Sequence, residues 1–486
     1  LGDIAFRTYD YALAREKFRE ALPLYRVAGS AFGEANCTKR FGDIALMMGE
    51  NAQAETYYRQ ALPLYRKLGS PLGEANCLKR LGDISYNNSE YGTARERYER
   101  ALALYRRSGS VLGEANCIRM LGDIAFAENN TAAAEDRFRK GLDRYRKVKS
   151  AQGEAYCLMR LGDLARAKGD IVRAEELYRK ALALYETKGA FPEKADCIRR
   201  LAELAAEKKD RAEAGRLVDR AIASLDRSAT GIRSADALYD IARVAQESGS
   251  APRAEKLYRE SAIRYRQIGS AIGEANCAYR IGELKMSAGK NEEAGASFKA
   301  AIPLYRKAGS LLGEANCLYR LGEINLNTGN HADAAARFNG ALELYRKAGS
   351  LLGEANCLYR LGVIRFDGKR LREANEFFTG ALGLYRKAPS ALGEANSLYM
   401  QGEVLFMNRS YQESGNRYAS AMDRYREAGS ILGEANCVYS LGDVDYYSKR
   451  YPEARAAYLK ARPLYERAGS SLGMKNCNIR LKQIGE

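Results

Sequence analysis

The phrase LYRKAGSLLGEANCLYRLG occupies residues 304–322 and recurs, letter for letter, at residues 344–362. Looser copies of its centre, Gly-Glu-Ala-Asn-Cys, appear along the rest of the chain. Written in rows of forty residues, the sequence aligns over residues 1–480 in twelve rows without a gap. A fixed period of this length indicates a repeat architecture, in which each unit buries its apolar face against its neighbours. We therefore predict one array, although 486 residues would otherwise suggest about three domains.

Each period predicts two helices joined by short turns. In residues 70–109, Ser70 has a side chain that caps the amino terminus of a helix, and apolar or small residues then recur at helical spacing. The polar residues 87–90 suit a turn, and a second apolar stripe begins at Tyr91. Gly109 suits the end of this second helix, because glycine accepts the positive φ found there. The predicted fold class is all-α.

Five positions of each period resemble the tetratricopeptide repeat. In one period they are Leu81, Gly82, Ala94, Tyr98 and Ala101, and the resemblance covers the whole chain. It implies a right-handed α-solenoid superhelix of about 12 helix-turn-helix repeats of 40 residues. Because the period is longer than the usual roughly 34 residues, the chain resembles the long repeats of kinesin light chains, of the Leu-Gly-Asn polarity proteins and of the sensor arrays of NLR-like signalling NTPases.

The regularity of the phrase divides the chain into segments. We predict an amino-terminal block at 1–190, degenerate units with a candidate bend at 191–250, a carboxyl-terminal block at 251–470 and a capping helix at 471–486. The phrase decays to EKADC at 193–197 and RSADA at 233–237, which drift in a tolerant repeat would also explain. Residue 1 falls in the middle of a first helix, so we expect further sequence upstream.

Composition argues against several classes of function. The single histidine, His331, cannot build a histidine metal cage or a catalytic triad. We therefore predict no enzyme activity, no cofactor and no metal. The net charge is +17, but Lys and Arg are interleaved with Asp and Glu, as on a solvated helical surface. We expect neither nucleic-acid nor membrane binding, and no stretch approaches the roughly 20 apolar residues of a membrane span.

The ten cysteines all occupy one column of the repeat, where Ala237 and Ser397 fill the two exceptions. Neighbouring cysteines are one repeat apart, roughly 10 Å at ordinary helix spacing, which is beyond disulfide reach. A position that also accepts Ala or Ser suits a small buried side chain. We predict reduced, packed cysteines and a cytoplasmic location.

The asparagine of the phrase is the strongest candidate for contact with a partner. In tetratricopeptide arrays the first helix of each repeat lines the concave groove, so the resemblance places this asparagine there. Its amide could pair with an extended peptide backbone, or it could bond a neighbouring helix and join the repeats. The next groove position is basic in the first half of the chain, except at Met159, and tyrosine in the second. The predicted peptide-binding residues are Asn36, Lys39, Asn76, Lys79, Asn116, Arg119, Asn276, Tyr279, Asn316, Tyr319, Asn356, Tyr359, Asn396, Tyr399, Asn436 and Tyr439.

A third groove position is mostly acidic, as at Asp43 and Asp83, and can pair with the lysine four residues earlier. We therefore predict a non-enzymatic scaffold that binds a protein or peptide segment in the groove, as the sensor or interaction part of a larger signalling protein. The alternative is a structural array that self-associates into an oligomer or filament.

Overall fold

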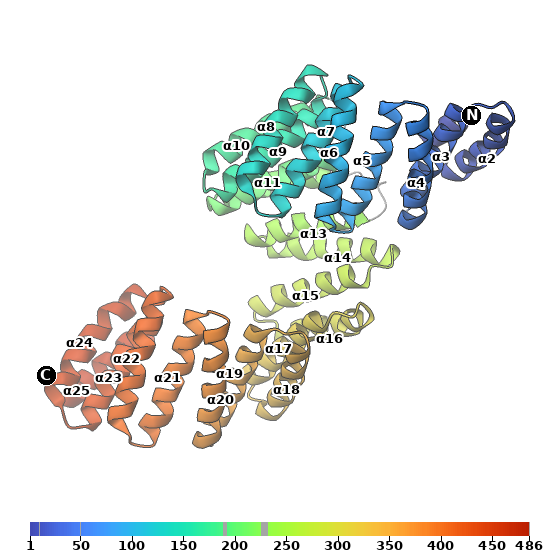
Figure 1. Cartoon of the computed structure of the whole chain (residues 1–486). Helices are drawn as coiled ribbons and strands as arrows, with labels where there is room; N and C mark the ends of the chain where they lie inside the picture. Colours follow the sequence, from blue (N-terminus) through green and yellow to red (C-terminus); the bar gives the residue numbers. More distant parts are fainter. Residues whose placement is uncertain (9, 49, 188–191, 225–231, 486) are drawn as a thin grey trace. The chain divides into compact units, whose positions relative to one another are not determined.

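The computed structural model describes residues 1–8, 10–48, 50–187, 192–224 and 232–485. These residues form 25 α-helices and no strand, so the all-α prediction is confirmed (Figure 1). The predicted boundary between residues 190 and 191 lies outside the described residues.

Odd-numbered and even-numbered helices alternate as the first and second helices of the repeats, and we call them A helices and B helices. The A helices are α1 (Gly2–Arg7), α3 (Ala31–Met47), α5 (Pro71–Asn87), α7 (Val111–Ala127), α9 (Ala151–Ala167), α11 (Pro192–Glu207), α13 (Ile232–Glu247), α15 (Ala271–Ser287), α17 (Leu311–Asn327), α19 (Leu351–Asp367), α21 (Ala391–Met407), α23 (Ile431–Tyr447) and α25 (Ser471–Ile484). The B helices are α2 (Tyr11–Val27), α4 (Asn51–Lys67), α6 (Tyr91–Arg107), α8 (Thr131–Lys147), α10 (Ile171–Glu186), α12 (Arg211–Ser224), α14 (Ala251–Gln267), α16 (Asn291–Lys307), α18 (His331–Lys347), α20 (Leu371–Lys387), α22 (Tyr411–Glu427) and α24 (Tyr451–Arg467).

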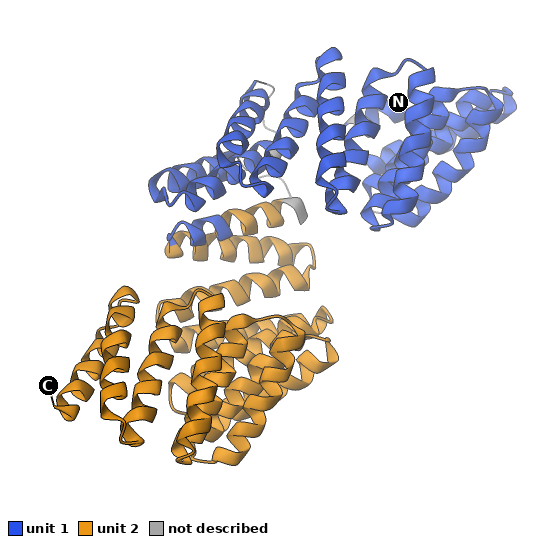
Figure 2. Ribbon diagram, turned by 60° about the vertical axis from the view of Figure 1, so that its left-hand side comes forward, with its two compact units in different colours: residues 1–229, 243–250 blue, residues 230–242, 251–486 orange. Residues whose placement is uncertain are grey.

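The chain forms two compact units, coloured separately in Figure 2. Unit 1 comprises Leu1–Ala229 and Arg243–Ser250, and unit 2 comprises Thr230–Ala242 and Ala251–Glu486. Within each unit, helices that follow one another along the chain pack side by side, as α15, α16 and α17 do. Each unit is thus a solenoid of helix pairs with the forty-residue spacing of the sequence.

The repeated Gly-Ser pair sets where one repeat ends and the next begins. Gly309 has a φ of +68°, which suits a residue without a Cβ, and the backbone N–H of Ser310 donates to the carbonyl of Tyr305 at 2.9 Å. The Ser310 hydroxyl oxygen then accepts from the backbone N–H of Gly313 at 3.2 Å and caps α17. The joint satisfies helix-end groups within very few residues, so the helix spacing stays regular.

Small residues of the A helices make room for aromatic rings of the B helices. A Cβ added to Gly322 in α17 would lie 2.7 Å from the Phe338 ring, and one added to Gly313 would lie 2.3 Å from the Tyr305 ring. All ten cysteines are buried and free, as their column predicted. Each repeat therefore has its own small core between one A helix and the B helices on its two sides. No helix in the described ranges is long and apolar enough to cross a membrane.

Candidate functional site

The predicted site residues all lie on A helices, at the positions that Asn316, Tyr319 and Glu323 occupy in α17. We call the surface formed by these positions, repeat after repeat, the A-face. In unit 1, α5 contacts α7 and α7 contacts α9, and in unit 2, α19 contacts α21 and α21 contacts α23. Among the described residues no two successive B helices pack to that extent. Across successive repeats, the A helices therefore approach one another more closely than the B helices do, and the A-face lies on the A helices.

Each predicted asparagine accepts a hydrogen bond from the tyrosine 29 residues later, on the B helix of its own repeat. Tyr345, for example, donates its hydroxyl to Oδ1 of Asn316 at 2.6 Å. The pairs are Asn36–Tyr65, Asn76–Tyr105, Asn116–Tyr145, Asn276–Tyr305, Asn316–Tyr345, Asn356–Tyr385, Asn396–Tyr425 and Asn436–Tyr465, at 2.6–2.9 Å. The bond fixes the amide with its oxygen toward the B helix and leaves its NH₂ group on the A-face.

The same tyrosines join successive repeats. The ring of Tyr345 packs against Gly353 of the next A helix, α19, where an added Cβ would lie 2.3 Å from it. The tyrosine thus contacts the asparagine of one A helix and the glycine of the next. Asp236 replaces the asparagine in α13, and it accepts from Tyr265 at 2.5 Å, so the acceptor is kept in that repeat.

The second predicted position behaves differently in the two halves. Lys39 and Lys79 pair with Asp43 and Asp83 at 2.9 and 2.7 Å, which confirms the predicted spacing of four residues, and Arg119 pairs with Asp123 at 3.1 Å. The tyrosines of unit 2 instead lay their partly exposed rings against the aromatic ring of the following B helix. The ring centroids are 5.3–5.8 Å apart in the pairs Tyr279–Phe298, Tyr319–Phe338, Tyr359–Phe378, Tyr399–Tyr418 and Tyr439–Tyr458.

The acids at the third position are held by arginines that the sequence analysis did not single out. Glu323 pairs with Arg320 of its own helix at 2.7 Å and with Arg360 of the next A helix at 2.7 Å. The same spacing of 37 residues recurs at 2.6–3.7 Å in the pairs Asp3–Arg40, Asp43–Arg80, Asp123–Arg160, Asp163–Arg200, Glu283–Arg320, Glu323–Arg360 and Asp443–Arg480. These pairs join one A helix to the next. The signal in the sequence is the arginine of the second LYR in both copies of the opening phrase.

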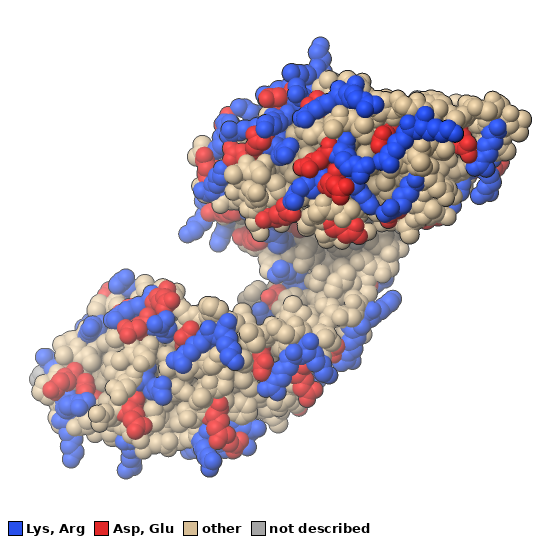
Figure 3. All heavy atoms as spheres, viewed as in Figure 1, with Lys and Arg blue, Asp and Glu red and all other residues tan. Residues whose placement is uncertain are grey.

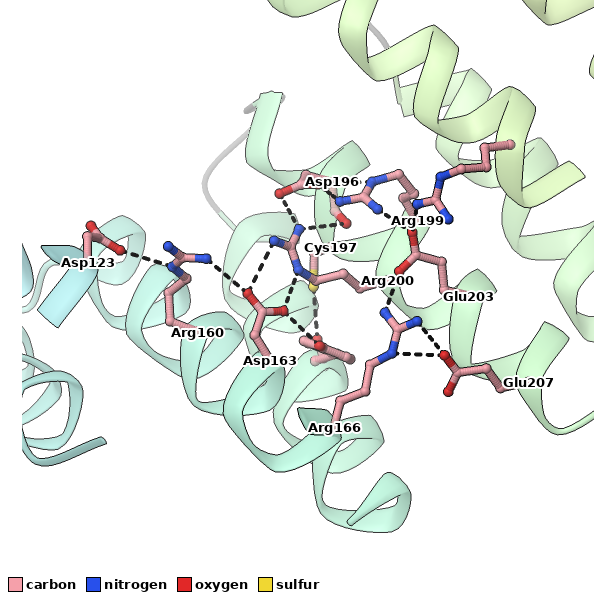
Figure 4. Close-up of polar contacts among 12 residues, drawn as sticks. Asp123, Arg160, Asp163, Arg166, Asp196, Cys197, Arg199, Arg200, Glu203 and Glu207 are labelled. Atoms are coloured by element: carbon pink, nitrogen blue, oxygen red, sulfur yellow. Dashed lines mark hydrogen bonds and ion pairs between the residues drawn. The ribbon is translucent and has the colours of Figure 1, made fainter. Parts of the chain in front are cut away.

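The pairs merge into one network where α7, α9 and α11 meet (Figure 4). Arg160 bridges Asp123 and Asp163 at 3.0 and 3.2 Å, and Arg200 continues from Asp163 to Asp196. Glu203 forms ion pairs with Arg166, at 2.5 Å, and with Arg199. Burial disfavours the charged form of Glu203, but its arginine neighbours outweigh burial and hold its pKa below the ordinary value. The network therefore keeps buried charges paired inside unit 1.

Family models for the tetratricopeptide repeat match residues 1–67, 74–147, 274–347 and 314–387, and a second such model matches residues 119–189. The chain belongs to the tetratricopeptide repeat family. A comparison with curated protein sequences finds no match. Tetratricopeptide repeats indicate a protein–protein interaction scaffold, and the A-face belongs to such an array.

Several solved structures align with most of this chain. A signal-transduction ATPase with numerous domains (STAND) protein with a tetratricopeptide repeat sensor, from Pyrococcus horikoshii, aligns with a TM-score of 0.50 and 14% identity over 79% of this chain and 55% of that chain. The apo form of RapI aligns with a TM-score of 0.46 and 10% identity over 68% of this chain and 97% of that one. The APC/C hetero-tetramer Cut9–Hcn1 aligns with a TM-score of 0.43 and 13% identity over 100% of this chain and 95% of that one.

The exposed surface of the tetratricopeptide array mixes charges of both signs. Figure 3 shows Lys and Arg side chains interspersed with Asp and Glu on the face drawn, over both units. In the described ranges no three His, Cys, Asp or Glu side chains come together in a way that could hold a metal ion. The arrangement suits recognition by many polar and aromatic contacts rather than by one charged patch.

Proposed function

We propose that this tetratricopeptide array is a non-enzymatic scaffold that binds an extended protein or peptide segment along the A-face. The observation that carries the proposal is the uniform orientation of the asparagine amides. Eight tyrosines fix these amides in one orientation, because each hydroxyl donates to the Oδ1 atom of its asparagine. A row of NH₂ donors is what the carbonyl oxygens of an extended backbone require, whatever its side chains.

The positions beside the asparagines would supply side-chain selectivity. In unit 1 the lysines and arginines are already paired with acids, as Lys79 is with Asp83, so that part of the A-face offers charge that is largely neutralised. In unit 2 the partly exposed rings of Tyr279, Tyr319 and Tyr359 offer amphipathic contact area. The close approach of successive A helices within each unit supports their placement on the inner side of a curved stack.

Asn→Asp substitutions test this proposal without removing the internal hydrogen bond. An aspartate still accepts from the tyrosine, as Asp236 does from Tyr265, but it has no NH₂ group to donate. We would select binders from a display library of random 12-residue peptides, which can span about 40 Å when extended, using the full chain. The variant Asn276→Asp/Asn316→Asp/Asn356→Asp should lose at least tenfold in affinity for the selected peptides.

The matched control places the same three charge changes on exposed positions of B helices, as Asn339→Asp/Asn375→Asp/Asn416→Asp. Its affinity should stay within about twofold of the parent chain, since surface substitutions away from contacts have small effects. Equal losses in both triple variants, or no loss in the first, would show that the amides do not contact the peptide.

A second candidate is self-association, and a row of exposed apolar side chains favours it. Leu312, Leu352, Leu392 and Leu432 are 46–50% exposed at the same place near the start of successive A helices. Light scattering of the parent chain and of a variant with these four residues changed to Ser separates the two candidates. An oligomer that the variant loses supports self-association, and a parent chain that stays monomeric at high concentration contradicts it.

The assignment to a sensor in a larger signalling protein has narrower support. It rests on the fold shared with the sensor-bearing STAND protein and on the resemblance of the forty-residue period to such sensors. Determining which domains accompany the array in its full polypeptide tests that assignment directly.

A further inference from the structure

One A-face acid differs from all the others in its partners. Every acid at the third position forms at least one ion pair with Lys or Arg, except Glu403 in α21, for which no ion pair exists within the described part of the chain. Two residues account for this. Ser440 stands in α23 where the spacing of 37 residues would place an arginine, and Met400 stands three residues before Glu403, where Arg320 precedes Glu323.

In the neighbouring repeats of unit 2 that arginine lies between a phenol and a carboxylate. Nε of Arg360 donates to the Tyr319 hydroxyl at 3.3 Å while its guanidinium pairs with Glu323 at 2.7 Å. Arg320 does the same with Tyr279 and Glu283, at 3.4 and 2.8 Å. A tyrosine and an acid four residues apart on an A helix thus form a ready-made acceptor pair for a guanidinium.

The chain compensates in other repeats where this arginine is absent. Met400 stands where the arginine would follow Val363 by 37 residues, but Val363 itself replaces the acid of the third position, so no carboxylate needs a partner there. Met120 replaces it opposite Asp83, which pairs instead with Lys79 and Arg80 at 2.7 and 3.4 Å. Glu403 has no such substitute, and its neighbours are hydroxyl groups. The Tyr418 hydroxyl donates to it at 2.7 Å, and the Tyr399 hydroxyl lies 3.1 Å from the Ser440 hydroxyl.

We propose that Tyr399 and Glu403 form a subsite for an arginine side chain of the bound segment, which takes the place that the chain's own arginine holds in neighbouring repeats. The inference deepens the proposed function and rests on it. Both residues are partly exposed, so a side chain lying along the A-face can reach them. Burial raises the pKa of Glu403 and nearby Asp443 raises it further, which is the state of a carboxylate that lacks a cation. A guanidinium would remove that cost and donate to the carboxylate in a planar fork.

A small probe tests the subsite without any peptide backbone. N-acetyl-L-arginine amide is titrated into the full chain, with ε-methyl-labelled methionine and the methyl signal of Met400 as the reporter, since Met400 lies between the two residues in α21. We expect a saturable shift with the arginine compound and none with N-acetyl-L-citrulline amide, its neutral isostere. Glu403→Gln should weaken binding at least tenfold, whereas the exposed control Glu376→Gln should not change it.

A second variant keeps the test independent of any damage from Glu403→Gln. Ser440→Arg restores the residue that the other repeats use, so it should abolish binding of the probe and raise the thermal midpoint of the chain. No saturable shift, or a shift that survives both variants, overturns the inference. If the selected peptides fail to bind the A-face but the probe behaves as expected, the peptide proposal falls and the cation subsite stands. If the peptides bind and exchange of their arginines for citrulline leaves their affinity unchanged, the subsite does not bind an arginine of the segment, which overturns the inference.

Discussion

The hydroxyl of Tyr345 donates to Oδ1 of Asn316 at 2.6 Å, and the ring of the same tyrosine packs against Gly353 in the next repeat. The tyrosine of the first LYR in the recurring phrase thus contacts two other residues of the phrase, the asparagine of one repeat and the glycine of the next. The phrase is repeated because its residues are partners of one another across repeats. The amide NH₂ group is the part of the asparagine that this bond does not use.

Tyr345→Phe should cost the array a hydrogen bond while keeping the ring in place. We expect a loss of about 1 kcal/mol in the free energy of local opening, the usual net worth of such a bond. Amide hydrogen exchange in α17 and α18 measures it. Tyr25→Phe is the matched control, because Tyr25 occupies the same column but is 41% exposed. A loss in the control as large as in Tyr345→Phe would contradict the assigned role of the bond.

Gly353→Ala should destabilise unit 2, because the new Cβ would lie 2.3 Å from the Tyr345 ring, which is confined between two A helices. Overpacking of this kind costs about 1–3 kcal/mol. Gly383 lies inside α20, where an added Cβ would meet nothing within 4 Å, so Gly383→Ala should stabilise by up to about 1 kcal/mol. Thermal unfolding of the two variants should therefore shift in opposite directions. Shifts of the same sign would refute the steric explanation of the helix glycines.

The period of the sequence was enough to predict the helices because each repeat meets the same neighbours. The packing of the cysteines followed from the residue types that alternate in their column, such as Ser397 in place of a cysteine. The sequence did not reveal the B-helix tyrosines as partners of the asparagines, or the arginines as partners of the acids. These contacts span 29 and 37 residues, as in Asn316–Tyr345 and Glu323–Arg360. Those contacts depend on which faces of the packed helices meet, and a one-dimensional pattern does not specify that.

The two alternatives for the asparagines turn out to concern different atoms of the same amide. The oxygen of Asn316 bonds a neighbouring helix, as one alternative predicted, but that helix belongs to its own repeat, and it is Tyr345 that reaches the next repeat. The other alternative, pairing of the NH₂ group with an extended peptide backbone, stays a prediction. The acid column also needs revision, since Glu323 and its equivalents join A helices through arginines in addition to any pairing within their own helix.

The cysteines should be nearly inert in the folded chain. Burial raises the pKa of Cys77, Cys117 and Cys157 to about 12, so little reactive thiolate exists at pH 8 and reagents cannot reach it. Titration with a chromogenic disulfide should count ten thiols in denaturant and react with almost none before unfolding. Rapid reaction of several thiols in the native chain would mean that the repeats open far more readily than their packing indicates.

Acid should loosen α11 in unit 1 more than α21 in unit 2. The pKa of Glu203 is lowered because Arg199, Arg166 and Arg243 outweigh its burial. A carboxylate with a depressed folded pKa stabilises the fold above its unfolded value, here 4.5, and this contribution is lost as the pH falls through the folded pKa.

The pKa of Glu403 is shifted in the opposite direction from that of Glu203. Its pKa is raised by burial, so the cost of its charge is relieved as the pH falls through the folded pKa. Hydrogen-exchange protection factors between pH 7 and about pH 3.5 should therefore decline several-fold more in α11 than in α21. Glu203→Gln should flatten the decline in α11, because glutamine has no proton to gain. Parallel declines in both helices, unchanged by Glu203→Gln, would show that these two carboxylates do not govern the acid response.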